Sequence, residues 1–312
     1  MIISYLVSLM SLSERLSKWL GLVIRNEWVF LFLMGAIMAG LSFIIDVSIE
    51  ILQERHYIFY MRDDLGKFLS YVPSNNISFS GMAARFIIWI IFPMSLVLLS
   101  VFVTNKISPA AVGSGIPEMK TILRSPTVHK EYVKAPVLIA KLFGLILALG
   151  SRLPVGKEGP FIHIACMIAI QLCKLQNKML GKKTEDSRMV ELLSAACAVG
   201  VSCCFAAPIG GVLFSIEVTS TYFAVRDYWR AFFGSVMSAL VFRIAAVFWR
   251  DEETLTALFR TSFSVDFPFD LVEIIAFIVI GIVAGLASAH FVIFHRYLSR
   301  KIPKIFRNNS QE

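Results

Sequence analysis

The chain has 312 residues, of which 57% are hydrophobic and 17% are charged, and its formal net charge is +8 at pH 7. Soluble domains carry about 25% charged residues, so this composition excludes a soluble enzyme and favours a membrane protein. The positive charge does not predict nucleic-acid binding, because the basic residues lie in short groups between apolar runs, as in the basic cytoplasmic loops of membrane proteins.

Apolar runs suited to a bilayer recur along the chain, and a spanning helix needs about 20 such residues. Residues 1–27 are predicted to form a cytoplasmic amphipathic segment, because basic residues precede the first apolar run. Helices in the membrane are predicted at 28–45, ending at Asp46, and at 86–104, 135–150, 192–216, 229–249 and 274–294. Pro208 and the two glycines after it interrupt the run at 192–216, which we expect to form two shorter helices.

The segments between these runs carry the charge. An acidic external loop is predicted at 251–270, and another external loop at about 50–80, where Asn76-Ile77-Ser78 matches a glycosylation sequon. Basic residues follow the last run, so both ends of the chain are predicted to be cytoplasmic.

Short motifs rich in glycine and proline punctuate the apolar sequence. They read GSGIPEMK at 113–120, GKEGPFIH at 156–163 and APIGGVLFSIE at 207–217. In the first two, glycine precedes a proline that fits the first turn of a helix. The N–H groups and dipole at such a helix start attract anions, and a helix that begins within the membrane marks a substrate site in transporters.

Polar residues in these motifs are candidates for the anion site. Ser114 can donate its hydroxyl to an anion, although a simple turn serine is an equally good interpretation. Glu158 lies where the backbone already favours negative charge, so its carboxylate can take the place of an anion and act as a gate. The alternative is a carboxylate at the membrane interface that pairs with Lys157 or Arg152.

Basic residues near the motifs can raise the local anion concentration. Arg152 and Lys157 can do so at a pore mouth, or they can be interfacial anchors. Lys141 can hold a positive potential beside the anion path, or its side chain can extend to the interface. The five cysteines are predicted to be small buried hydrophobes, and the spacing of the histidines predicts no metal site.

Taken together, GSGIPE, GKEGP and GGVLFSIE resemble the voltage-gated chloride channel (CLC) family, in particular its animal plasma-membrane channels. The resemblance implies an all-α, polytopic membrane protein with broken helices and two inverted repeats. Residues 28–250 would form the first repeat, and 271–312 the opening helix of the second with a basic cytoplasmic end. It further implies a homodimer with one anion pore per subunit, with chloride as the permeant ion and no cofactor.

Site residues follow from the same resemblance. Chloride would be bound by Ser114, Gly115, Ile116, Gly159 and Pro160, and Glu158 would be the gating glutamate. Val218 stands where the exchangers of the family have a second glutamate, which implies passive conduction rather than chloride/proton exchange.

The chain departs from the family pattern because it contains no G-x-F-x-P motif and no paired CBS modules. We therefore expect a truncated channel subunit. The alternatives are a non-conducting half-channel that modulates full-length subunits, and a chloride/proton exchanger.

Overall fold

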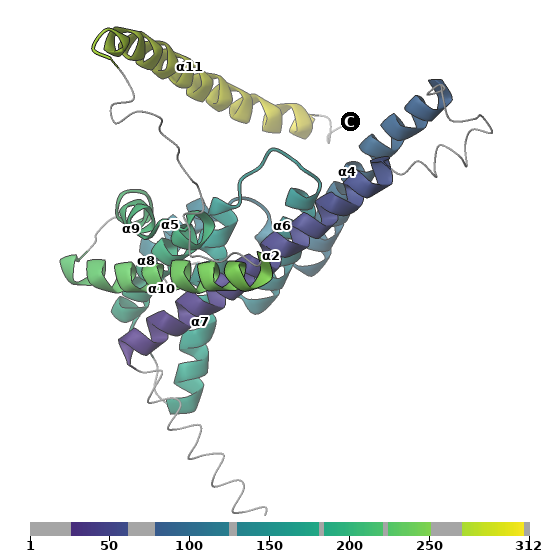
Figure 1. Cartoon of the computed structure of the whole chain (residues 1–312). Helices are drawn as coiled ribbons and strands as arrows, with labels where there is room; N and C mark the ends of the chain where they lie inside the picture. The colour runs from purple at the N-terminus through teal and green to yellow at the C-terminus, as the bar shows by residue number, and fades with distance from the viewer. Residues whose placement is uncertain are drawn as a thin grey trace, which may run out of the picture. The chain divides into compact units, whose positions relative to one another are not determined.

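The computed structural model describes residues 26–61, 79–124, 130–180, 184–220, 224–250 and 270–308. In these ranges every regular element is helical, which agrees with the predicted all-α class. The helices lie at α2 (Glu27–Met61), α4 (Phe79–Ile107), α5 (Ile116–Arg124), α6 (Ala135–Gly150), α7 (Glu158–Leu180), α8 (Asp186–Phe205), α9 (Pro208–Phe214), α10 (Val225–Arg250) and α11 (Glu273–Asn308) (Figure 1). Two 3₁₀ turns, η1 (Pro109–Ala111) and η2 (Lys130–Val133), and one π-helical turn, η3 (Ser215–Thr219), lie between them.

Six of the described helices are long and apolar enough to cross a membrane, namely α2, α4, α7, α8, α10 and α11. Helix α6 and the segment Pro208–Thr219 are apolar but shorter. The chain is therefore a multi-pass membrane protein with short helices between its spans, as predicted. Residues 1–25, the sequon at Asn76 and most of the predicted loop at 251–270 lie outside the described residues.

Three sequence-based boundaries require comment. Helix α2 does not end at Asp46 but continues to Met61, so residues 50–61 are helical rather than part of an external loop. Asp46 lies within the helix, and its carboxylate is paired with Lys157 from the segment before α7. Helix α7 was not predicted to span the membrane, although a helix start was predicted at its first residues, in the motif GKEGPFIH. The split of the run at 192–216 is confirmed, with α8 ending at Phe205 and α9 beginning at Pro208.

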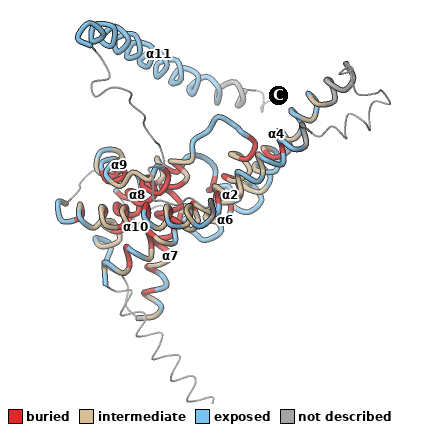
Figure 2. The backbone as a smooth tube through the Cα atoms, viewed as in Figure 1, coloured by how far each residue is buried: buried red, intermediate tan, exposed pale blue. Residues whose placement is uncertain are grey.

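Helices α7 and α8 form the centre of the larger unit, residues 1–258 (Figure 2). Of the most apolar stretch of α8, 72% is buried, compared with 6% for α4. Small side chains make close packing possible, as they do in membrane helices generally. A Cβ on Gly200 of α8 would lie only 2.9 Å from the carbonyl oxygen of Phe161 in α7. All five cysteines are buried in these two helices, as predicted.

Helices α2 and α10 pack against each other at a second close approach. A Cβ on Gly35 would lie 2.9 Å from the carbonyl oxygen of Gly234 and 3.1 Å from the amide nitrogen of Ser238. Glycine at position 35 therefore lets the two backbones approach to a distance that no larger residue allows without displacement.

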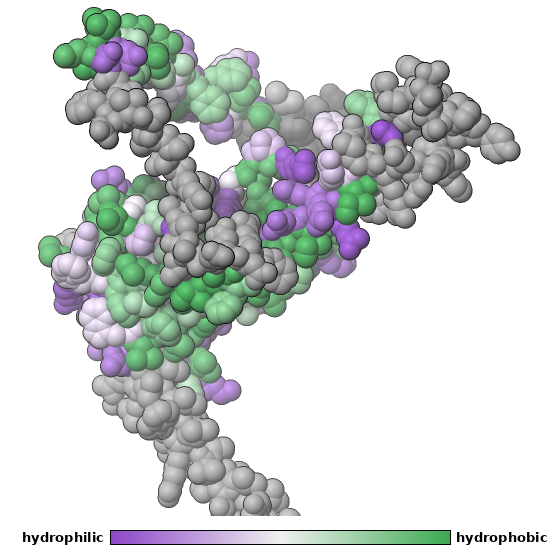
Figure 3. Space-filling model, viewed as in Figure 1, coloured by the Kyte–Doolittle hydropathy of each residue, from purple (hydrophilic) through white to green (hydrophobic). Residues whose placement is uncertain are grey.

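Apolar side chains also cover much of the outer surface (Figure 3). Helix α4 exposes Phe86, Trp89, Leu98 and Phe102. Exposed apolar surface of this extent is unfavourable in water and suits contact with lipid. The smaller unit, residues 259–312, contains α11, whose described side chains are exposed around the whole helix.

Candidate functional site

A cavity of about 800 Å³ lies where the first two glycine-proline motifs meet. Its walls come from α4, from the segment before α5, from α6, from the segment before α7 and from the end of α9. The sequence-predicted site residues that line it are Ser114, Ile116, Lys141, Glu158, Gly159 and Pro160. Segments separated by more than 40 residues in the chain thus contribute to one site.

The start of α5 forms one wall of the cavity. Gly113 and Gly115 have φ angles of +92° and +89°, which residues with a side chain rarely adopt, so these glycines make the turn that precedes the helix. Gly115 itself is buried behind the lining. The first amide bonded within the helix is that of Met119, which donates to the carbonyl of Gly115 at 3.0 Å. The N–H groups before it have no intrahelical partner and suit an anion.

The start of α7 forms a second wall. The amide of Phe161 donates to the carbonyl of Lys157 at 3.0 Å, so the N–H groups of Glu158 and Gly159 precede the first bond of the helix. The Glu158 carboxylate folds back over Gly156, since a Cβ at position 156 would overlap its Oε2 atom. A tethered negative charge therefore lies at the helix start, where the dipole favours it.

The two helix starts are in direct contact at one point. A Cβ on Gly159 would overlap the Oγ of Ser114 and would lie 3.1 Å from both its Cβ and its carbonyl oxygen. The absence of a side chain at Gly159 therefore places the Ser114 hydroxyl beside the first turn of α7. An anion in the cavity can be reached by donors from both motifs at once.

Lys141 does not extend to the interface, because its side chain is only 4% exposed and lines the cavity. Its Nζ lies 2.9 Å from Nδ1 of His163 in α7. The structure thus places the Lys141 ammonium at the cavity wall.

Lys157 and Arg152 lie outside the lining of the cavity. Lys157 is paired with Asp46 of α2, at 2.8 and 2.9 Å from its two carboxylate oxygens, and its Nζ also lies 5.5 Å from the ring centroid of Phe161. Arg152 is exposed, with a φ of +59°. Within the described ranges Glu158 has no ion pair, so the structure does not give it the lysine partner that the sequence left open.

Sequence reasoning did not point to the wall formed by α4, whose polar lining residues are Ser100, Thr104 and Asn105, whereas Phe214 at the end of α9 belongs to the third motif. The hydroxyl of Ser100 donates to the carbonyl of Gly144 at 2.8 Å, and that of Thr104 to the carbonyl of Ser100 at 2.7 Å. The Ser100 hydroxyl thus joins α4 to α6, and the Thr104 hydroxyl is bonded within α4, so both already have a protein acceptor. The third motif contributes Phe214 rather than its helix start.

Val218 lies in the π-helical turn η3 and is half-buried, while the preceding Glu217 is exposed. Neither residue lines the cavity. A π turn adds a residue to the helical repeat and is common at functional sites. Here it follows directly after Phe214, the residue of α9 that lines the cavity.

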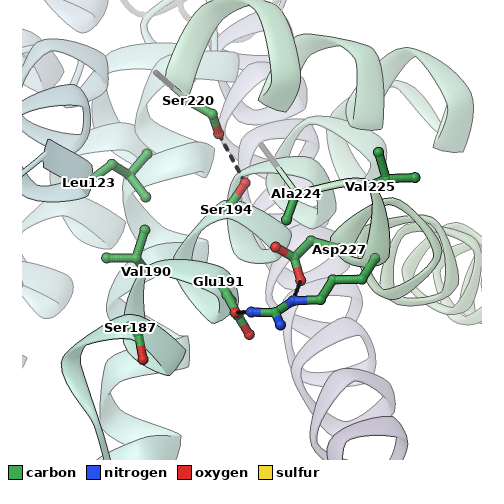
Figure 4. A pocket seen from close by; sticks show the side chains of 10 residues that line it. Leu123, Ser187, Val190, Glu191, Ser194, Ser220, Ala224, Val225 and Asp227 are labelled. Atoms are coloured by element: carbon green, nitrogen blue, oxygen red, sulfur yellow. Dashed lines mark hydrogen bonds and ion pairs between the residues drawn. The ribbon is translucent and has the colours of Figure 1, made fainter. Parts of the chain in front are cut away.

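A second cavity, of about 910 Å³, lies at the first turns of α8 and α10 (Figure 4). Arg226 bridges Glu191 and Asp227 across it, and Ser194 and Ser220 share a hydrogen bond of 3.0 Å. Arg230 adds bonds to Glu191 at 2.9 Å, to Asp227 at 3.1 Å and to Glu27 of α2 at 2.7 Å. These charges satisfy one another and tie three helices together, which indicates a structural role.

Comparisons with known proteins agree with this architecture. A eukaryotic CLC transporter of known crystal structure matches 73% of this chain and 39% of its own, with a TM-score of 0.58 and 32% identity. Chloride channel protein 2 of Homo sapiens is 49% identical over 95% of this chain and 31% of its own length. Its Drosophila melanogaster namesake is 47% identical over 91% of this chain and 23% of its own. The chain thus spans less than a third of the length of these curated relatives.

The family model described as "Voltage gated chloride channel" matches residues 96–310, which is more than half of the chain and includes the first two motifs, Lys141 and Val218. Together with the helix starts that share one cavity, this match shows that the chain belongs to the voltage-gated chloride channel family.

Proposed function

We propose that this chain supplies the chloride-binding part of a passive, voltage-gated chloride pore. The observation that carries the proposal is that the starts of α5 and α7 line one cavity, with Ser114 and Glu158 both facing it. Two helix starts, one hydroxyl and the Lys141 ammonium give an anion several donors in one cavity. The names of the relatives, chloride channel proteins 1 and 2, agree with this ligand.

Glu158 is the gating residue in this proposal. Its carboxylate lies at a helix start that also suits chloride, and the neighbouring Lys157 is held by Asp46 instead. The carboxylate and a chloride ion therefore compete for the same backbone donors. The pore is closed when the carboxylate occupies the site and open when chloride or a proton displaces it.

The remaining assignments rest on family membership. Val218 offers no carboxylate for proton transfer, which supports conduction rather than exchange. We further propose a homodimer of multi-pass subunits in the plasma membrane, with no cofactor.

The test is a patch-clamp comparison of two matched variants of the protein, expressed from its complete reading frame. Glu158→Gln removes the charge with little change of size, and we expect voltage-dependent closing to disappear. Glu54→Gln makes the same change at an exposed position of α2 and should leave closing intact. Normal closing in Glu158→Gln would contradict the gating role.

A second measurement separates conduction from exchange. Vesicles that contain the protein are given a chloride gradient, and the internal pH is followed with a dye. We expect chloride flux with no proton uptake. Proton uptake driven by chloride would instead establish an exchanger, and the absence of any chloride flux would overturn the proposal.

A further inference from the structure

His163 is fully buried in α7, and both of its ring nitrogens have a partner. Nε2 lies 2.8 Å from the carbonyl oxygen of Tyr132 in η2, and Nδ1 lies 2.9 Å from Nζ of Lys141. The imidazole therefore connects the turn η2 with the lysine that lines the anion cavity.

These partners determine the protonation of the ring. A carbonyl oxygen only accepts, so Nε2 must carry the hydrogen and donate to Tyr132. The Lys141 ammonium only donates, so Nδ1 must accept with its lone pair. A doubly protonated ring would turn an N–H group towards the ammonium with no acceptor between them. The geometry thus fits a neutral imidazole with its hydrogen on Nε2.

A third contact fixes where the ring lies. A Cβ on Gly115 would be 2.6 Å from the Cβ of His163 and 2.7 Å from its Nδ1. The imidazole is therefore packed against the turn that precedes α5, in the space that a side chain at position 115 would take. His163 touches both the first motif and Lys141, although it does not line the cavity itself.

A neutral partner has a specific electrostatic consequence for Lys141. A buried ammonium needs acceptors, and in proteins these are usually carboxylates, which also cancel its charge. An imidazole nitrogen satisfies one of the three donors and cancels no charge. The Glu118 carboxylate is near enough to interact with Lys141 through space, but it forms no ion pair with it in the described part of the chain. The hydrogen-bond partner of Lys141 therefore leaves the positive charge of the ammonium in place beside the cavity.

We propose that His163 is a positioning residue that holds the Lys141 ammonium at the anion cavity through a neutral acceptor, and so sets the affinity of the pore for chloride. This inference rests on the proposed chloride pore. It assigns to His163 a role that acts through Lys141, without contact with the ion.

Two amide variants, each of which keeps one of the two hydrogen bonds of His163, separate this role from simple packing. In His163→Asn the side-chain oxygen can take the place of Nδ1, which keeps the acceptor for Lys141. In His163→Gln the amide nitrogen can take the place of Nε2, which keeps the donor for Tyr132 and loses the acceptor. The readout is the chloride concentration that gives half-maximal current, compared with the maximal current, in the protein expressed from its complete reading frame.

We expect His163→Asn to stay close to the wild type and His163→Gln to bind chloride roughly tenfold more weakly, as for loss of a hydrogen bond to a charged group. Lys141→Met should weaken binding at least as much, and His163→Gln should add nothing in that background. Equal losses of chloride affinity in His163→Asn and His163→Gln would overturn the inference. So would a His163→Gln effect in the Lys141→Met background that is as large as in the wild type. A wild type without chloride-dependent current would refute the proposed pore instead, which keeps the two failures distinct.

Discussion

Gly159→Ala tests whether the two helix starts act on one anion. The added Cβ overlaps the Ser114 hydroxyl, which must rotate away from the first turn of α7. It also lies 3.1 Å from the Cβ and the carbonyl oxygen of Ser114, whereas ordinary contact begins at 3.4 Å, so the backbone there must retreat by a few tenths of an ångström. The variant therefore removes one donor from the cavity without removing any polar group from the protein.

The loss can be estimated from the donor that is displaced. A hydrogen bond to a charged group contributes about 1.5–3 kcal/mol, which corresponds to roughly 10- to 100-fold in chloride affinity. The assay is the chloride dependence of the current, with surface expression measured in parallel. Gly40→Ala is the matched control, because a Cβ at position 40 of α2 meets nothing within 4 Å.

The result that refutes this reasoning is specific. If Gly159→Ala has the chloride affinity of Gly40→Ala, the hydroxyl of Ser114 does not act together with the start of α7. A double variant adds a further check: once Ser114→Gly has removed the hydroxyl and the Cβ, only the contact with the carbonyl oxygen of residue 114 remains, so Gly159→Ala should lower the affinity by less than it does alone. Independent, additive losses would show that the two changes act at separate places.

Three further variants address contacts away from the cavity. Asp46→Asn leaves the charge of Lys157 unpaired, so the local chloride concentration and with it the current at low chloride should rise severalfold. The gain should fade near 1 M salt, where the Debye length is about 3 Å, and a gain that does not depend on salt would contradict this reasoning. Gly35→Ala forces a Cβ to 2.9 Å from a carbonyl oxygen of α10 and should destabilise the protein by about 1–3 kcal/mol, seen as a lower apparent Tm in detergent; an unchanged Tm would show that the α2–α10 contact adjusts freely. Arg230→Met leaves the carboxylates of three helices without a shared cation, and we expect a loss of about 1–3 kcal/mol in thermal unfolding, whereas no loss would show that Arg226 alone suffices.

The local sequence predicted the parts of the site that consist of backbone N–H groups at helix starts. The glycines of the first two motifs and the prolines after them predicted two helix starts, and both helices begin where expected, at Ile116 and Glu158. That these starts meet in one cavity required the structure, because the contact between Gly159 and Ser114 joins segments 45 positions apart.

Charged residues inside helices were less predictable. The sequence predicts that the first span ends at Asp46, yet α2 continues past it. An unpaired carboxylate within a membrane helix is costly. The partner that removes this cost, Lys157, lies 111 positions away. Likewise, the buried Lys141 ammonium has His163 as its hydrogen-bond partner. The spacing of His163 from other residues in the sequence matches no metal-binding or catalytic motif, so the sequence did not indicate this contact. Pairings of this kind depend on tertiary contacts, which periodicity does not reveal.

The burial of all five cysteines makes the native chain a ready background for labelling experiments. Thiol reagents react with accessible thiolates, and the close packing of α7 and α8 shields all five native thiols. A cysteine introduced at position 114 would then be the single reactive group. The rate at which charged methanethiosulfonates modify it from either side of the membrane would report the route by which ions enter.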